Sequence, residues 1–264
     1  MTLTSNIRVR VDCTNPGQFF ACCGLLELAD RLWPGAVGWF EDMNFHLITD
    51  GSLRELLLSV SNAEFKQTDL SDKTASPITM GTPFRSLRVD WWSMKQSDGA
   101  RLKTWAGRMD VVRIANAMRK VLSHSKFDSS ELLNIGLVVF DPINSDDKVE
   151  PFYFDARRAI GSHSRDVGFS PDKLELQTTA FPAVEFLTLV GLQRVQPVST
   201  DQARFFDYHT WGLPLPPDLL PLAITGHYPF PLSQAFRFEN WYRTGQRKHK
   251  AFRPAQPITQ GTVS

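Results

Sequence analysis

The sequence lacks most features of secreted, membrane-bound or metal-stapled proteins. Its three cysteines, Cys13, Cys22 and Cys23, are odd in number and include no C-x-x-C pair, which argues against a disulfide framework or a structural zinc site. It has no run of about 18 apolar residues that could span a bilayer, and its first residues lack the layout of a signal peptide. These absences predict a reduced, cytoplasmic protein that makes no membrane contact.

Motifs for catalysis are also scarce. The chain has no phosphate-binding glycine motif, no G-x-S-x-G, no H-E-x-x-H and no His-Asp dipeptide. The remaining candidates are His163 and Asp166, with Asp207 and His209 as a second carboxylate and imidazole, and these groups would have to meet in space to act. Hydrogen bonding within loops is the simpler interpretation. We therefore expect no enzyme activity, cofactor or metal, and keep a metal-dependent nuclease as an alternative.

The first 83 residues carry the clearest structural pattern. Apolar and polar residues alternate over 7–12, as in a half-buried strand, and apolar residues recur every three or four positions over 19–33, as in a helix. Two further strands are expected at 37–41 and 44–49, and a helix at 52–65 with Ser52 as its N-cap. This β-α-β-β-α order predicts a ferredoxin-like, or RNA-recognition-like, unit.

Residues 84–264 are expected to extend this unit with further antiparallel strands and two or three helices, giving an α+β fold. The extension is taken to pack on residues 1–83, either as a second domain or as part of one continuous domain. A long polar loop is expected from beyond Phe65 to Pro83, and the proline-rich segment 198–264 favours short strands and turns over long helices. The spacing predicts helices at 102–123 and 179–195, and strands at 84–92, 135–140 and 152–155.

A net charge of only +1 conceals two strongly basic segments. Residues 84–126 carry ten basic and three acidic residues, a net +7, and residues 236–264 carry a net +5. The segment 127–155 between them carries −6. Two basic segments in a nearly neutral chain predict a local footprint for a polyanion, because phosphate attraction acts within about 10 Å at physiological salt. Two solvated faces, neutralised by the acidic segment, are the alternative.

The basic segments also hold four of the seven tryptophans. Cations beside exposed rings are typical of RNA and single-strand binding, since phosphates need charge and unstacked bases need a ring. If 84–92 is a strand, Arg88 and Trp92 share one face and Trp91 lies on the other. We therefore expect Trp91 and Trp105 to be packing residues and Trp92 to be a contact.

Two other segments can meet a phosphate. The C-terminal segment 241–253 is interpreted either as a hairpin around Gly245 or as a basic tail that orders on binding. The segment 155–165 combines arginines with small residues that let a backbone approach closely, although an ordinary surface loop explains it equally well. The candidate nucleic-acid contacts are Arg85, Arg88, Trp92, Lys95, Arg101, Lys103, Arg108, Arg157, Arg158, Arg165, Arg243, Arg247, Lys248 and Lys250.

Several strings resemble one family. They are NPGQFFACCGLLELA at 15–29, VDWW at 89–92, KTWAG at 103–107, DVGFS at 166–170 and PAVEFLTLVGL at 182–192. Together they resemble CRISPR-associated proteins of subtype I-U, also called I-G: the Csb-type, or reduced large-subunit, family of the Cascade interference complex. The similarity runs from about residue 5 to residue 255, and the first string is the most specific.

The resemblance implies a non-catalytic subunit of a Cascade-like complex. Its partners would be a guide RNA, the target DNA, backbone and RNA-processing subunits and a recruited helicase-nuclease. A large subunit of this kind reads the short flanking motif (PAM) and holds the opened target DNA. The chain is short for a large subunit, so a separate small subunit is the expected source of the usual helical bundle. The rival role is a guide-RNA-binding subunit, and a purely structural adaptor that buries Trp91 and Trp105 against a neighbour is a third possibility.

Overall fold

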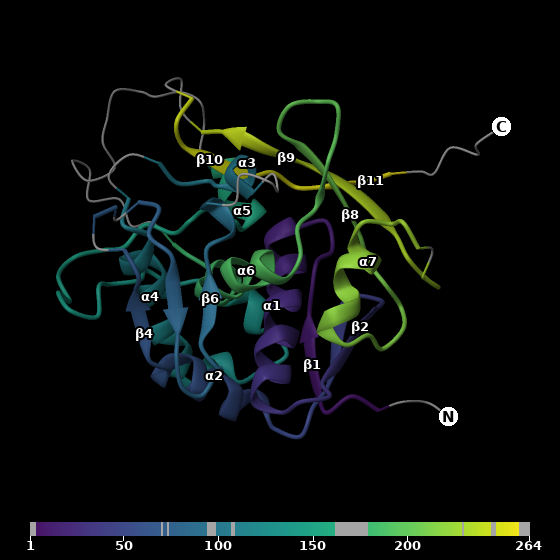
Figure 1. Cartoon of the computed structure of the whole chain (residues 1–264), viewed down its shortest axis with the longest axis horizontal. Coiled ribbons are helices and arrows are strands. Elements are labelled where there is room, and N and C mark those ends of the chain that lie inside the picture. Colours follow the sequence, from purple (N-terminus) through teal and green to yellow (C-terminus); the bar gives the residue numbers. More distant parts are fainter. Residues whose placement is uncertain are drawn as a thin grey trace.

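The computed structural model describes residues 4–69, 71–72, 74–93, 99–106, 109–161, 179–228, 230–243 and 247–258. The fold is α+β, as predicted (Figure 1). It begins with β1 (Ile7–Arg10), α1 (Pro16–Leu32), β2 (Val37–Glu41), β3 (Asn44–Ile48) and α2 (Leu53–Asn62). The three strands form an antiparallel sheet in the order β1-β3-β2, as expected for a ferredoxin-like unit.

Local capping explains where the first helices begin. The Asn15 side chain accepts hydrogen bonds from the Gly17 and Gln18 backbone N–H groups, and Pro16 occupies the first turn of α1. Ser52 and Glu55 form a complete capping box at the start of α2. Both predicted helices are therefore confirmed, each with a start fixed by its own side chains.

A second small sheet occupies part of the segment for which a loop was expected. Its strands are β4 (Phe65–Gln67), β5 (Ile78–Met80) and β6 (Leu87–Val89), paired antiparallel in that order. The loop prediction is wrong for β4 and β5, because three-residue strands are too short to show a sequence period. β4 pairs with β5 and not with β1, whose Arg10 N–H instead donates to the Ser130 carbonyl at 2.7 Å.

The middle of the chain departs most from expectation. The predicted helix 102–123 is interrupted: α3 (Gly99–Leu102) ends early, and α4 (Val111–Lys120) begins where Asp110 caps it. The expected strand 135–140 is reduced to the isolated bridges Leu137↔Ala180 and Phe140↔Lys148, and the strand expected at 152–155 is wrong, because those residues form neither a strand nor a bridge. Two further helices follow, α5 (Ala156–Gly161) and α6 (Pro182–Arg194), the second confirming the helix expected at 179–195.

The C-terminal region forms a larger antiparallel sheet, as its prolines indicated. Its strands are β7 (Val198–Ser199), β8 (Phe205–His209), β9 (Ala235–Tyr242), β10 (Lys250–Phe252) and β11 (Gln256–Pro257), with α7 (Leu220–Ile224) between β8 and β9. The order is β10-β9-β8-β7, and β11 also pairs with β9. Short 3-10 helices lie at Trp91–Ser93, Val121–Ser123, Ser125–Phe127, Leu132–Asn134 and Pro217–Leu219.

Helices α1 and α6 pack against each other at the centre of the molecule (Figure 1). Fourteen of the 17 residues of α1 are buried, so this helix has protein on nearly all sides. One continuous hydrophobic core extends from Ile7 to Ala255 and includes residues from both sides of position 83. Segments 1–83 and 84–264 therefore share one core.

Candidate nucleic-acid interface

The β9–β10 hairpin brings the two basic segments of the sequence together. The Arg101 carbonyl accepts hydrogen bonds from Lys250 Nζ at 3.0 Å and from Asn240 Nδ2 at 2.8 Å. The Lys250 backbone N–H donates to the Thr104 carbonyl at 2.8 Å. A hairpin is thus confirmed for the C-terminal segment, with Tyr242 opposite Lys250. We call the cations gathered here the hairpin cluster: Arg101, Lys103, Arg158, Arg204, Arg243, Lys248 and Lys250.

Lys250 lies on one face of this cluster, and its pKa is lowered there. Burial, and next the charges of Arg204, Arg101 and Lys103, lower the pKa of its ammonium to about 8. Burial is the larger cause of the low pKa, and the three like charges add to it because positive neighbours disfavour a charged amine. A group of cations of this kind attracts an anion.

The other face of the hairpin carries a ring with two cations against it. The Arg243 guanidinium lies 3.4 Å from the centre of the Tyr153 ring, and that of Arg158 lies 5.8 Å away. The Tyr153 hydroxyl donates to Glu150. Burial, and next the Arg243 charge, lower the pKa of the adjacent His249 imidazole, while the Glu150 charge acts in the opposite direction.

Unpaired polar atoms concentrate around the same hairpin. Within the described part of the chain, six buried side-chain atoms have no hydrogen-bond partner, and five of them belong to residues at or against the hairpin. An unsatisfied buried polar atom costs about 1–3 kcal/mol, and native proteins carry few of them. The fold therefore leaves hydrogen-bonding capacity unused around this hairpin. The five atoms are Thr104 Oγ1, Arg158 Nε, Arg204 Nε, Asn240 Oδ1 and His249 Nδ1.

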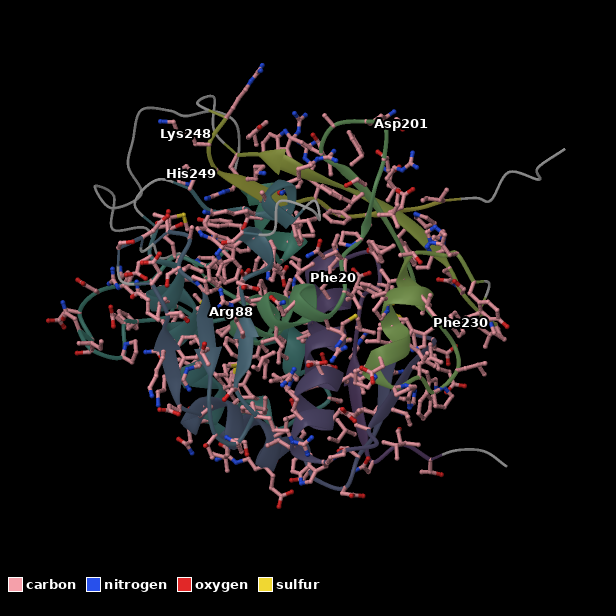
Figure 2. The ribbon with its side chains drawn as sticks, in the orientation of Figure 1. Phe20, Arg88, Asp201, Phe230, Lys248 and His249 are labelled. Carbon is pink, nitrogen blue, oxygen red and sulfur yellow. The ribbon has the colours of Figure 1, made fainter. Side chains whose placement is uncertain are left out.

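The expected site residues of the β6 region do not join the hairpin cluster. Figure 2 shows Arg88 well apart from Lys248 and His249. Arg88 is ion-paired with Asp90 at 2.6 Å, and the exposed Arg85 lies in the turn before β6. The first basic segment is thus divided between two parts of the surface. At the hairpin itself, Arg247 and Lys248 are exposed.

The expectation that Trp92 faces outward is wrong. The strand ends at Val89 and the chain turns into a 3-10 helix, which ends the alternation and buries Trp92 to 3 % exposure. Its indole N–H donates to the Ala75 carbonyl at 2.9 Å, and its ring packs against Trp105 and Trp91. The expected burial of Trp91 and Trp105 is confirmed.

Other candidates have structural partners. Arg157 donates to the buried Asp155 carboxylate through Nε and Nη2, at 2.9 and 2.6 Å, and stacks on Phe181. Lys103 Nζ donates to the Thr74 carbonyl at 3.0 Å. Asp207 accepts two hydrogen bonds from Arg237, and the His209 ring lies 3.1 Å from the Ile224 carbonyl. Lys95, Arg108, His163, Arg165, Asp166, the DVGFS string, Gly107 and Gly245 lie outside the described residues.

The described ranges contain no group of three or more His, Cys, Asp or Glu residues that could hold a metal ion. Nor do they contain a helix long and apolar enough to cross a membrane.

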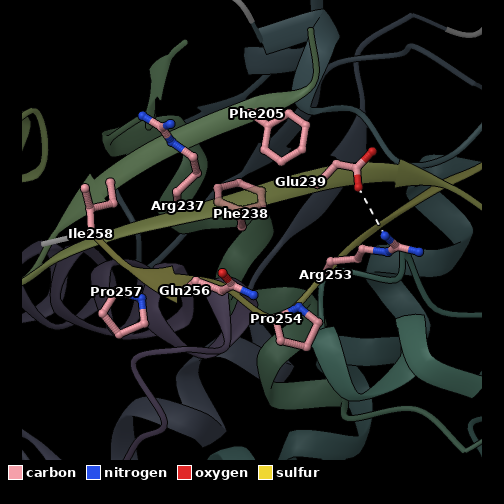
Figure 3. Close-up of a pocket in the computed structure, with 9 residues that line it drawn as sticks. All are labelled: Phe205, Arg237, Phe238, Glu239, Arg253, Pro254, Gln256, Pro257 and Ile258. Carbon is pink, nitrogen blue, oxygen red and sulfur yellow. Dashed lines mark hydrogen bonds and ion pairs between the residues drawn. The ribbon is translucent and has the colours of Figure 1, made fainter. Parts of the chain in front are cut away.

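Sequence reasoning missed a groove on the outer side of the C-terminal sheet (Figure 3). It has a volume of about 520 Å³ and lies between β8, β9 and the chain around β11. Arg204, which belongs to the hairpin cluster, was also missed. The available signal was the alternation of β9, which places Arg237, Glu239 and Trp241 on one face.

Comparison of the chain with protein-family models, curated proteins and solved structures finds no match.

Proposed function

We propose that this chain is a non-catalytic, nucleic-acid-binding subunit of a type I CRISPR interference complex that acts in the cytoplasm. The hairpin cluster is the observation that supports nucleic-acid binding, and the sequence resemblance is the support for this particular complex. In this role the chain would contact the PAM duplex or the opened target strand, alongside a guide RNA, backbone and RNA-processing subunits and a recruited helicase-nuclease.

The chemistry of the hairpin suits a phosphate backbone. Arg243 and Lys248 supply positive charge. The described carboxylates of this region are Glu150, which accepts a hydrogen bond from Tyr153, and Glu239, which binds Arg204 and Arg253. Each cation that neutralises a phosphate releases condensed counterions, so binding of this kind weakens steeply with salt. Phosphate contacts position a strand without reading its sequence.

A guide-RNA-binding subunit of the same complex is the second candidate. The observation that favours it is the ferredoxin-like β-α-β-β-α start of the chain, the arrangement found in RNA-recognition folds. Binding of the isolated protein to repeat-derived RNA, but not to a PAM duplex, would favour this role. A nuclease role is not supported by the partners of Asp207 and His209.

The test compares two sets of charge-neutralised variants in the reconstituted complex. The hairpin variant changes Arg243, Lys248 and Lys250 to Gln. The control changes three cations in or beside the β4–β6 sheet, Lys66, Arg85 and Arg88, to Gln. Removing three phosphate contacts should lower target affinity about tenfold or more. It should also reduce the slope of log affinity against log salt concentration by about three, because about three fewer counterions are released on binding.

The control variant should bind target DNA like the unmodified complex. If the hairpin variant also keeps full affinity and the same salt slope, the hairpin cluster has no part in binding. If the control loses more affinity than the hairpin variant, the β6 surface is the interface instead.

A further inference from the structure

The groove on the outer face of the C-terminal sheet is large enough for a small ligand. Its volume of about 520 Å³ lies within the 300–1,000 Å³ usual for ligand sites. Strand alternation builds it: Phe236 and Phe238 of β9 face the core, while Arg237 and Glu239 face outward. The lining residues are Phe205, Arg237, Phe238, Glu239, Arg253, Pro254, Gln256, Pro257 and Ile258.

Pairing across the strands sets one ring and one amide on opposite sides of this groove. Phe205 of β8 is opposite Glu239, and Gln256 of β11 is opposite Arg237 on the other side of β9. Phe205 is half-buried and Gln256 is exposed. A planar group entering the groove would therefore meet an aromatic ring from β8 and a hydrogen-bonding amide from β11 (Figure 3).

Guanidinium groups outnumber carboxylates around the groove. Arg237 is held by Asp207 through two hydrogen bonds of 2.7 Å, while Arg253 and Arg204 share Glu239 at 3.3 and 3.1 Å. Three cations facing two anions leave a net positive charge. An arginine has five N–H donors, and Arg253 uses one of them on Glu239, which leaves donors for an anionic ligand.

The groove is also continuous with the hairpin cluster. Both lie along β9, and Arg243 is four residues beyond Glu239, a separation of about 13 Å at 3.3 Å per residue. Trp241 lies between them on the same face, with the Arg253 guanidinium 4.1 Å from the centre of its ring. One ring therefore lies between the cations of the groove and Arg243, and proteins that follow single-stranded nucleic acid combine rings and cations in this way.

We propose that this groove receives one unstacked base of a single-stranded nucleic acid whose backbone follows β9 to the hairpin cluster. Phe205 contacts the face of the base, the Gln256 amide hydrogen-bonds its edge, and Arg253 contacts the adjacent phosphate. A duplex does not fit this role, because its bases are stacked and paired. The inference rests on the proposed function and adds to it a second, base-dependent contact.

The experiment measures binding of the full chain to three labelled twelve-residue single strands by fluorescence anisotropy. One strand is DNA, one is RNA of the same sequence, and one is DNA without bases over its central part. The variants are Phe205→Leu, which removes the ring and keeps the bulk, Phe205→Tyr, which keeps the ring, and Gln256→Ala. Thermal unfolding checks that each variant folds, and Gln256→Ala changes only an exposed side chain.

A stacked base should make the base-bearing strands bind about tenfold more tightly than the abasic strand. Phe205→Leu should remove most of that difference and leave abasic binding unchanged, Gln256→Ala should reduce it, and Phe205→Tyr should preserve it. The ratio between the RNA and DNA arms identifies which single strand the groove receives.

Two outcomes overturn the inference and can be told apart. If Phe205→Leu and Gln256→Ala bind every strand like the unmodified chain, while the hairpin variant loses affinity, the groove is not a base site and the proposed function stands. If the unmodified chain binds none of the strands, nucleic-acid binding by this chain fails and the groove assignment fails with it.

Discussion

Gly24 of α1 and Gly191 of α6 face each other where the two central helices cross. A Cβ atom on Gly24 would lie 2.0 Å from the Leu187 carbonyl oxygen and 3.0 Å from the Gly191 nitrogen. A Cβ atom on Gly191 would lie 2.0 Å from the Phe20 carbonyl oxygen and 3.0 Å from the Gly24 nitrogen. The backbones therefore touch directly, and no side chain of any size fits between them.

Replacing either glycine by alanine should destabilise the protein. Alanine favours an isolated helix by up to about 1 kcal/mol over glycine, but here the added methyl group forces the helices apart, which should cost about 2–3 kcal/mol net. Denaturant unfolding of Gly24→Ala, Gly191→Ala and the double variant measures this cost. The double variant should lose less than the sum of the two, because one separation accommodates both methyl groups. A single variant as stable as the original chain would contradict the contact.

The helices that form this crossing were predictable from the sequence. A period of three to four residues marks α1 and α6, and Pro182 is a proline suited to the first turn of α6. Asp110 also carries a start signal, but the apolar spacing continues across it and predicts one helix in place of α3 and α4. Trp92 was misplaced for a similar reason, because alternation does not reveal where a strand ends.

The hairpin cluster could not be predicted from the sequence, because it depends on contacts between segments that lie far apart in the chain. Lys250 Nζ and the Arg101 carbonyl are bonded although 149 positions separate them in the chain. Composition showed that both segments were basic, but the register of β10 on β9 decides which cations meet. The groove depends on the same register, since Phe205 and Gln256 come together only because β8 and β11 flank one strand.

The stability contribution of Lys250 should depend on pH. Its pKa in the folded state is about 8, below the ordinary 10.5, so at pH 7 the fold bears the full cost of a charged, partly buried ammonium. As pH rises from about 8 to 10.5, the folded state loses its proton first and this cost is relieved. Relative to Lys250→Met, the original chain should gain about 2 kcal/mol between pH 7.5 and 9.5 in denaturant unfolding. Identical pH profiles for the two proteins would show that the ammonium is not perturbed.

Glu185 should show the opposite dependence. Its side chain is fully buried at the start of α6, where it accepts from the Phe154 and Asp155 N–H groups at 3.3 Å. Burial, and next the Asp155 charge, raise its pKa to about 8 from 4.5. The folded state therefore holds this proton more tightly than the unfolded state, a stabilisation that is full below pH 4.5 and is lost as pH rises towards 8.

Glu185→Gln cannot ionise and should escape this loss. Its free energy of unfolding relative to the original chain should rise by about 3 kcal/mol between pH 4.5 and 7. Urea unfolding across that range, at constant ionic strength, measures the difference. A pH-independent difference between the two proteins would mean that Glu185 titrates normally in the fold.

The fluorescence of Trp241 should show whether a single strand binds along β9. Trp91, Trp92, Trp105 and Trp211 are at most 3 % exposed, whereas Trp241 is half-buried on the face that links the groove to the hairpin cluster. Single-stranded nucleic acid that follows β9 should contact this ring and change its emission. Titration with the DNA strand should therefore quench part of the intrinsic fluorescence.

The matched variants decide whether Trp241 carries that signal. Trp241→Phe should lose the quenching, whereas Trp33→Phe, which removes a half-buried tryptophan just past the end of α1, should keep it. The Arg253 guanidinium over the Trp241 ring is the nearest cation to the expected phosphate, so Arg253→Gln should weaken the titration without abolishing the quenching at saturation. Quenching that persists in Trp241→Phe and disappears in Trp33→Phe would place the bound strand elsewhere, because only a ligand near the end of α1 produces that result.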